Sequence, residues 1–401
     1  MGMAAEKVVD QVQTGKGTEG GTRESRRIPE LDGIRGLAIL MVVCMHMFYT
    51  PGYGGGQTLA PIGRVFALGW SGVDLFFVLS GFLIGGILLD NRESTRYFQT
   101  FYARRFFRIV PAYYAWILLF VVVVKLGGGL LHENTRSGIV PEVGWGIFRQ
   151  LLFLQNLWEQ HYVKLALWWF GPSWSLAVEE QFYLVTPLLL KYLPRRFQPM
   201  ALAAIVGLVP ALRYVVHVHC VTSGIKPTPA YRLMPCRADS LAMGIALAFV
   251  WRRPQFREWV REQAGLLNAT FGALLIAVLV LAWKYSDPLE LVQQTVGYSI
   301  LALFFSLLIA LTISRPQSVL ANAFRSRTLR ELGRVSYCMY LIHVAVGYFW
   351  FGLIERQIPN FASWKSGGIG LLSIVTTYVV ACVSWKLLEE PMLRFGHRHR
   401  F

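Results

Sequence analysis

The stretch LDGIRGLAILMVVCMHM, residues 31–47, is an apolar run long enough to enter a lipid bilayer, yet it contains the ionisable residues Asp32, Arg35 and His46. Arg35 and His46 are eleven residues apart, and at about 100° per residue this separation returns to within roughly 20° of the same helix face. Ionisable groups inside membrane helices are costly and usually serve a function. The pattern therefore predicts a membrane helix with a cation and an imidazole on one face.

The composition of the whole chain is typical of a membrane protein with many spans. Of its 401 residues, 54% are hydrophobic and 15% are charged, whereas soluble domains carry about 25% charged residues. The formal net charge of +16 lies in short basic clusters between apolar runs, which favours the positive-inside rule over nucleic-acid binding. We expect a disordered cytoplasmic tail over residues 1–28, a membrane domain over 29–394 and a basic cytoplasmic tail over 395–401.

Ten apolar segments of spanning or near-spanning length predict an all-α polytopic fold with about ten transmembrane helices. Arginines gather in alternate connections, which predicts that both chain termini are cytoplasmic. A further stretch, residues 145–158, is interrupted by Arg149 and Gln150 and predicts an interfacial or partly buried helix. The ten segments cover residues 32–49, 70–89, 109–126, 174–192, 199–217, 238–251, 266–283, 294–313, 334–353 and 369–388.

Polar residues of several spans fall at a similar depth, in the half of the membrane that faces outward in this topology. They include His46, Asp74, Glu179 and Asp239. Histidine is the usual general base near neutral pH, and a carboxylate beside it would fix its tautomer. We therefore predict that His46 is the base and that Asp74 or Glu179 orients it.

Each of these residues also has a simpler explanation. His46 could make only a hydrogen bond between helices, and Asp74 could pair with an arginine or histidine of another helix. Glu179 and Glu180 are adjacent, so their side chains point about 100° apart and at most one of them faces a shared site.

The half of the membrane that faces inward in this topology is basic. Arg104 and Arg108 share a helix face, and Arg35 lies at a similar depth. Guanidinium groups beside a helix amino terminus suit a phosphate ligand. The positive-inside rule alone could explain the arginines near residue 104, but it explains Arg35 less well because Arg35 lies inside an apolar segment.

The cysteines predict one disulfide and no metal site. Cys220 and Cys236 fall in the same predicted outer loop, where an oxidising compartment would permit a disulfide. No spacing of cysteine and histidine is typical of a zinc site, so we expect no bound metal.

Six stretches, in order between residues 31 and 391, resemble motifs of the acyltransferase 3 family of integral membrane O-acyltransferases. Each motif is weak alone, but six in the order of the family are specific. They are LDGIRGLAILMVVCMH, GVDLFFVLSGFLIG, YARRFFRIVP, WSLAVEEQFYL, LGRVSYCMYLIH and EEP.

The resemblance implies an enzyme of the cytoplasmic (inner) membrane that moves an acyl group, often acetyl, from cytoplasmic acyl-CoA to a hydroxyl of a sugar, glycan or glycoside outside. Acetyl-CoA is the expected donor. The matching functional pair is Arg35 and His46, and Arg105 and Arg108 match a second basic motif. The residues expected to bind the donor are therefore Arg35, Arg104, Arg105 and Arg108.

Two points about the transfer step remain open between alternatives. The sequence has no serine or cysteine in a nucleophile motif, which favours direct transfer over an acyl-enzyme. Some members of the family carry a fused extracytoplasmic SGNH domain, whereas this sequence ends at Phe401 without one. A partner protein could therefore complete the transfer.

A proton-coupled transporter of a small or lipid-linked substrate is the alternative function, because ionisable residues inside the membrane also serve as relays. The sequence has no evident inverted repeat, and its basic groups concentrate toward one mouth, so the enzyme is favoured. A non-catalytic sensor or scaffold is a third class, and it would tolerate the loss of His46.

Overall fold

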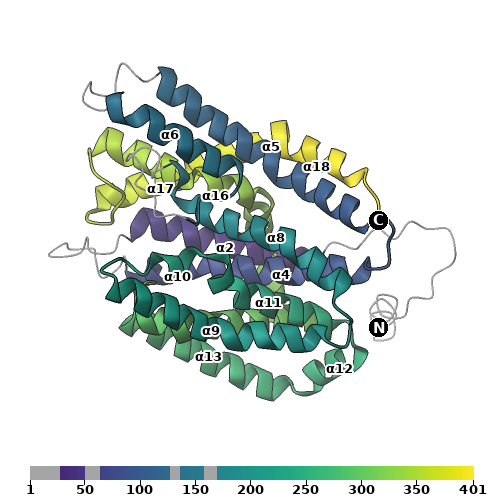
Figure 1. The fold of residues 1–401 in the computed structure, drawn as a ribbon. Coiled ribbons are helices and arrows are strands. Elements are labelled where there is room, and N and C mark those ends of the chain that lie inside the picture. The colour runs from purple at the N-terminus through teal and green to yellow at the C-terminus, as the bar shows by residue number, and fades with distance from the viewer. Residues whose placement is uncertain (1–27, 50–63, 127–135, 158–168) are drawn as a thin grey trace.

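The computed structural model describes residues 28–49, 64–126, 136–157 and 169–401, and the regular structure in these ranges is entirely helical. Figure 1 shows the helices packed as one bundle. The helices in chain order are α2 (Pro29–Phe48), η1 (Arg64–Ser71), α4 (Gly72–Asp90), α5 (Tyr97–Leu126), α6 (Arg136–Leu151), η4 (Gly171–Ser173), α8 (Trp174–Tyr192), α9 (Gln198–Thr222), α10 (Thr228–Arg232), α11 (Met234–Trp251), α12 (Pro254–Glu262), α13 (Ala264–Lys284), η5 (Gln293–Gly297), α14 (Tyr298–Ser314), α15 (Val319–Phe324), α16 (Arg327–Ile354), α17 (Trp364–Ser384), η6 (Trp385–Glu389) and α18 (Glu390–His397).

Within the described ranges, nine helices are long and apolar enough to cross a membrane. The protein is thus an all-α polytopic membrane protein, and these helices contain nine of the ten predicted segments. The one remaining segment, residues 174–192, forms helix α8, which does not qualify as a span. The reason is its charge, because Glu179, Glu180 and Lys191 all lie within its length. The predicted tail over residues 1–28 lies outside the described residues apart from Ile28.

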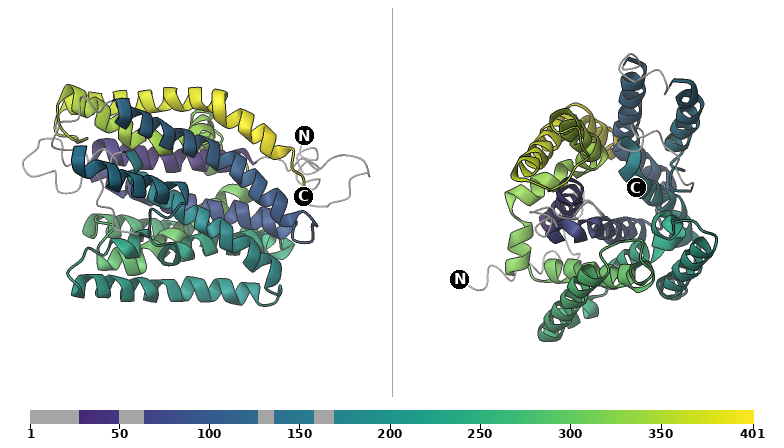
Figure 2. Two further views of the ribbon diagram at one scale, coloured as in Figure 1. Left: turned by 45° about the horizontal axis from the view of Figure 1, so that its top comes forward. Right: turned by 90° about the vertical axis from the view of Figure 1, so that its left-hand side faces the viewer.

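Helices α2 and α4 form the centre of the bundle. The view along the bundle in Figure 2 shows both of them surrounded by the other helices. Most of their length is accordingly buried within the protein, whereas α13 is exposed along most of its length. The large exposed side chains in the middle of α13, such as Leu275, Ile276 and Leu279, are apolar, as expected of a helix that faces lipid. The polar residues of α2 and α4 are therefore shielded from lipid by protein.

Helix α16 runs beside α2 in the same direction. A Cβ atom added to Gly333 would lie 1.9 Å from the carbonyl oxygen of Asp32, so the two backbones touch near the start of α2. Toward its end, Gly347 of α16 faces the side chain of Met47. Small residues allow such close approach between membrane helices. This packing lets side chains in the second half of α2 meet side chains of α16.

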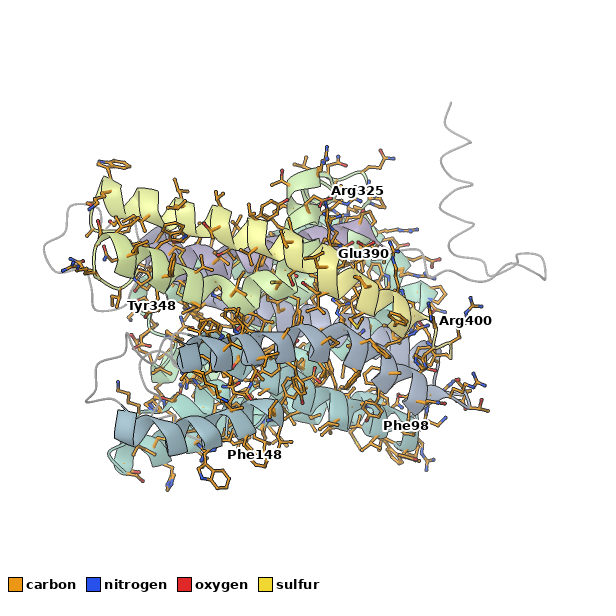
Figure 3. The ribbon with its side chains drawn as sticks, turned by 90° about the horizontal axis from the view of Figure 1, so that it is seen from above. Phe98, Phe148, Arg325, Tyr348, Glu390 and Arg400 are labelled. Carbon is orange, nitrogen blue, oxygen red and sulfur yellow. The ribbon has the colours of Figure 1, made fainter. Side chains whose placement is uncertain are left out.

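The two ends of the bundle differ in character. We call the end that contains the last turn of α2 and the start of α8 the cavity end, and the end that contains the start of α5 the arginine end. Figure 3 labels Tyr348 at the cavity end and Arg400 at the arginine end.

The C-terminal residues, which are expected to form a basic tail, pack against α5 at the arginine end. Thr100 Oγ1 donates a hydrogen bond to the carbonyl oxygen of Arg400, and Arg104 Nε donates one to that of His399, each at 2.9 Å. The Arg104 guanidinium also lies 5.2 Å from the centre of the Phe401 ring. The segment is therefore docked onto the membrane domain.

The predicted disulfide between Cys220 and Cys236 is wrong. Cys220 lies in the last turn of α9 and Cys236 in the first turn of α11, so neither belongs to a loop. Both side chains are buried, and Cys236 is a free thiol. A disulfide requires Cβ atoms about 3.5–4.5 Å apart, and helix packing, not closeness in the sequence, sets that distance here.

The described part of the stretch predicted over residues 145–158, which is residues 145–157, is partly buried, as predicted. Helix α6 ends within it at Leu151. The side chain of Trp145 is 66% exposed, whereas Gln150 is fully buried and accepts a hydrogen bond from Ser173 Oγ at 3.0 Å.

Candidate active site

A cavity of about 350 Å³ lies at the cavity end, between α2, η1, η4, α10 and α16. Concave sites with aromatic walls and a few polar groups are the usual form of a small-molecule site. Two basic side chains, His46 and Arg232, also line the cavity. Its aromatic lining consists of Tyr49, Trp70, Trp174, Tyr231, Tyr340 and Tyr348.

His46 meets a second histidine beside this cavity. Its Nδ1 lies 2.9 Å from the carbonyl oxygen of Val42, one helical turn earlier. The same nitrogen lies 3.3 Å from Nε2 of His343 on α16. The two imidazole rings meet edge to face with their centres 4.9 Å apart. His343 is absent from the predicted site, and its signal in the sequence is a second histidine inside an apolar segment.

The hydrogen-bond partners define which ring nitrogens carry hydrogen when both histidines are neutral. Nδ1 of His343 lies 2.8 Å from the carbonyl oxygen of Tyr340 and 3.2 Å from that of Met339. Carbonyl oxygens only accept, so Nδ1 of His343 donates and its Nε2 keeps the lone pair. Nδ1 of His46 then faces two acceptors, Val42 and His343, and must also carry hydrogen. This assignment leaves the lone pair of His46 on Nε2, as a general base requires.

Tyr340 connects the histidine pair to the wall of the cavity. Its ring centre lies 5.7 Å from that of His343. Its hydroxyl donates to the carbonyl oxygen of Pro172 at 2.9 Å and shares a hydrogen bond with Ser175 Oγ at 2.5 Å. These bonds hold η4 and the first turn of α8 against α16. The wall of the cavity beside the histidines is therefore braced by side-chain hydrogen bonds.

Asp74 is paired with an arginine of α11, not with His46. Arg237 Nη2 donates to Asp74 Oδ1 at 2.5 Å, and both side chains are fully buried. Ser240 Oγ makes a longer bond of 3.4 Å to the same oxygen. The Arg237 guanidinium also lies 4.0 Å from the centre of the Tyr298 ring. Asp74 thus joins α4 to α11, which agrees with the simpler explanation that it pairs with an arginine of another helix.

Glu179 lies nearer to the arginine end than expected. Ser80 Oγ donates to Glu179 Oε1 at 2.9 Å, and Tyr183 OH donates to its other oxygen at 3.4 Å. Ser80 is six residues beyond Asp74 on α4, which is about 9 Å along the helix. Helix α8 begins at Trp174, whose side chain lines the cavity, so Glu179 lies more than one helical turn beyond the cavity. The adjacent Glu180 keeps a buried oxygen, Oε1, without a hydrogen bond.

The arginines of α5 lie beside this glutamate cluster. The Arg105 guanidinium stands 5.6 Å from the centre of the Tyr183 ring, and the charge of Arg105 acts on Glu179 and Glu180. Arg108 also acts electrostatically on Glu179. Two cations in the first half of α5, Arg105 and Arg108, therefore lie close to the carboxylates of α8.

The other two arginines predicted to bind the donor, Arg35 and Arg104, contact different parts of the protein. Arg35 Nη1 lies 3.0 Å from Asp32 Oδ1 on its own helix, and its side chain remains 22% exposed. Arg104 holds the C-terminal segment. Over the described ranges, no group of three or more His, Cys, Asp or Glu side chains could hold a metal ion.

Comparisons with known proteins give one family. A family model described as an acyltransferase domain matches residues 28–386. The peptidoglycan O-acetyltransferase OatA of Listeria monocytogenes is 30% identical over 393 residues, which cover 95% of this chain and 58% of that protein. The putative peptidoglycan O-acetyltransferase YrhL of Bacillus subtilis is 30% identical over 388 residues, covering 94% and 56% of the two chains.

The O-acetyltransferase OatA of Staphylococcus aureus is 25% identical over 384 residues, covering 93% of this chain and 58% of that protein. The chain thus spans somewhat more than half the length of these relatives. No solved structure gives a significant match. Because the family model covers nearly the whole membrane bundle, the chain belongs to the acyltransferase 3 family of multi-pass integral membrane proteins.

Proposed function

We propose that this chain is a membrane O-acyltransferase that moves an acyl group, acetyl in the first instance, from acyl-CoA to a hydroxyl of a carbohydrate. The observation that carries the proposal is the histidine pair at the cavity. His46 lines the cavity, and both acceptors around it engage Nδ1, so its Nε2 lone pair is the one available to a substrate. An imidazole in this state suits proton removal from a hydroxyl.

The proposed topology has the arginine end in the cytoplasm and the cavity end outside. The positive-inside rule supports this orientation, because arginines crowd the connections at the arginine end. Acyl-CoA is polyanionic and its pool is cytoplasmic, so the donor would enter from that side. Guanidinium groups bind phosphates through charge-assisted hydrogen bonds. Arg35, Arg104, Arg105 and Arg108 are the residues that we assign to the donor.

The proposed reaction is a direct transfer. Nε2 of His46 takes the proton of the acceptor hydroxyl while the hydroxyl oxygen attacks the thioester carbonyl carbon. The carbon–sulfur bond then breaks, and the departing thiolate of CoA takes the proton from Nε2 of His46. The products are an ester and free CoA, and the base returns to its starting state. No acyl-enzyme is needed.

The cavity supports a carbohydrate as the acceptor. A volume of about 350 Å³ is within the range of small-molecule sites, about 300–1,000 Å³. Flat aromatic side chains such as Trp70 and Trp174 offer apolar faces to a sugar ring, and their polar edges suit its hydroxyls. Two of the relatives are named for peptidoglycan, so a glycan of the cell envelope is the first acceptor to test.

Replacement of His46 tests the proposal. We expect His46→Asn and His46→Ala to fold, to bind acyl-CoA as the wild type does, and to transfer about 10²–10⁴-fold more slowly, because a general base contributes about that factor. The matched control is His217→Asn on α9. His217 is also a membrane histidine with a hydrogen bond, 2.7 Å from Nδ1 to Gln294 Oε1, but it does not line the cavity.

The assay follows CoA release and mass-resolved acetylation of soluble glycan fragments by the purified protein. Wild-type turnover in His46→Asn would refute the assignment of the base. A proton-coupled transporter is the second candidate, since Glu179, Glu180 and Arg105 are ionisable residues that lie partly buried between helices. In proteoliposomes, net movement of the acceptor without CoA release would favour the transporter.

A further inference from the structure

We propose that His343 is the positioning residue for His46, and that it acts as a neutral hydrogen-bond acceptor in the role that a carboxylate has in other catalytic sites. The inference rests on the proposed function of His46 as base. It concerns which residue fixes the tautomer and the ring direction of that base.

The first argument is geometric. His343 is fully buried in α16, and two backbone carbonyls, of Tyr340 at 2.8 Å and Met339 at 3.2 Å, take the hydrogen of its Nδ1. Its Nε2 is therefore an acceptor in the neutral ring and points at Nδ1 of His46 from 3.3 Å. The backbone thus determines the direction of one imidazole, and that imidazole, together with the carbonyl oxygen of Val42, places the hydrogen of His46 on Nδ1.

The second argument concerns charge. Among the described residues, the hydrogen bonds and ring contacts of His343 go to two carbonyl oxygens, the ring of Tyr340 and His46, and none of these partners is anionic. The two residues that could have supplied a carboxylate are engaged elsewhere, Asp74 with Arg237 and Glu179 with Ser80. A charged orienting group in the membrane interior would carry a desolvation cost that a neutral imidazole avoids.

The third argument concerns the function of such a contact. Nδ1 of His46 has the carbonyl oxygen of Val42 as its other acceptor. That carbonyl belongs to α2 itself, so it does not fix the position of the ring relative to the other helices. His343 supplies that constraint from a second helix, which is packed backbone to backbone against α2. Partners that orient a metal-bound histidine typically contribute about 10–100-fold, which sets the scale for a contact of this kind, and a triad base held in the wrong tautomer loses about 10⁴-fold.

Three substitutions at one position test the proposal. His343→Gln carries its carboxamide at the distance of Nε2 and can accept the hydrogen from Nδ1 of His46. His343→Asn is shorter, so its amide can satisfy the carbonyls of Met339 and Tyr340 but does not reach His46. His343→Ala does neither. Each variant is purified in detergent, and its thermal unfolding and its binding of acyl-CoA are measured before turnover.

We expect kcat to fall about 100-fold in His343→Asn and His343→Ala, with the KM values for donor and acceptor unchanged. His343→Gln should retain activity within about tenfold of the wild type. A purely structural role would instead follow thermal stability, with no special rescue by glutamine. The proposal is overturned if glutamine is as inactive as alanine, or if His343→Asn turns over at the wild-type rate.

A spectroscopic measurement gives an independent result. Nitrogen-15 NMR of protein labelled at histidine reports which ring nitrogen is protonated, and the His46→Asn variant identifies the His46 signals. Wild type should show hydrogen on Nδ1 of His46, and His343→Ala should show a mixture of the two tautomers. An unchanged tautomer in His343→Ala would contradict the proposal. If the tautomer changes as expected but His46→Asn still turns over normally, the orienting contact stands and the proposed base is wrong.

Discussion

Removal of the carboxylate of Asp74 should destabilise the protein, not stop its chemistry. Arg237 and Asp74 are both fully buried, with 2.5 Å between Nη2 and Oδ1. Asp74→Ala would leave the guanidinium in the interior without its nearest anion. Breaking a buried pair in this way typically costs about 3–5 kcal/mol, because one charge remains uncompensated. That is a large share of a typical folding free energy of about 5–15 kcal/mol.

The same helix provides a matched control. Asp90, at the other end of α4, also accepts from an arginine, with 2.6 Å between its Oδ2 and Arg252 Nη2, but the Asp90 side chain is 60% exposed. An exposed pair contributes only about 0–1 kcal/mol, so Asp90→Ala should be nearly neutral. The double variant Asp74→Leu with Arg237→Met removes both buried charges and should recover most of the stability lost in Asp74→Ala.

The assay combines thermal unfolding in detergent with transfer activity divided by the amount of folded protein. Asp74→Ala should unfold at a clearly lower temperature than Asp90→Ala, and its folded fraction should keep activity within about tenfold of wild type, since Asp74 has no hydrogen bond to His46. If Asp74→Ala unfolded at the wild-type temperature and lost transfer by about 10²-fold or more, Asp74 would be catalytic and the reasoning from its ion pair would be refuted.

Three further outcomes follow from individual contacts. Gly244→Ala should sharply lower the yield and the unfolding temperature, because its Cβ would lie 2.1 Å from the carbonyl oxygen of Val78 and force α11 away from α4; a wild-type unfolding temperature would contradict this. Arg35→Ala should weaken acyl-CoA binding by about 1.5–3 kcal/mol, as expected for a lost charge-assisted bond, and calorimetry showing a change only for the acceptor would contradict the assignment. Cys236 should react with a maleimide only after denaturation, since it is a buried free thiol, and recovery of a Cys220–Cys236 disulfide peptide from a non-reducing digest would oppose this.

The helices and the position of His46 follow from local sequence. An apolar run in a membrane must satisfy its own backbone, so a run of spanning length predicts a helix wherever it falls. For the same reason, the ionisable residues on α2 could be recognised as candidates, and His46 does line the cavity. The sequence also predicts a span over residues 174–192, but helix α8 carries Glu179, Glu180 and Lys191 and does not qualify as one.

The partners of these residues were decided by tertiary structure alone. Depth along a helix can be counted from the sequence, but the direction around the bundle axis cannot, so the sequence alone allows both Asp74 and Glu179 to reach His46. Packing places Asp74 against Arg237 and Glu179 against Ser80, farther along α4. The true neighbour of His46 is His343, which is 297 residues away in the chain. That contact depends on the close approach of α2 and α16. These helices are far apart in the sequence, so only their packing in the folded protein brings the two histidines together.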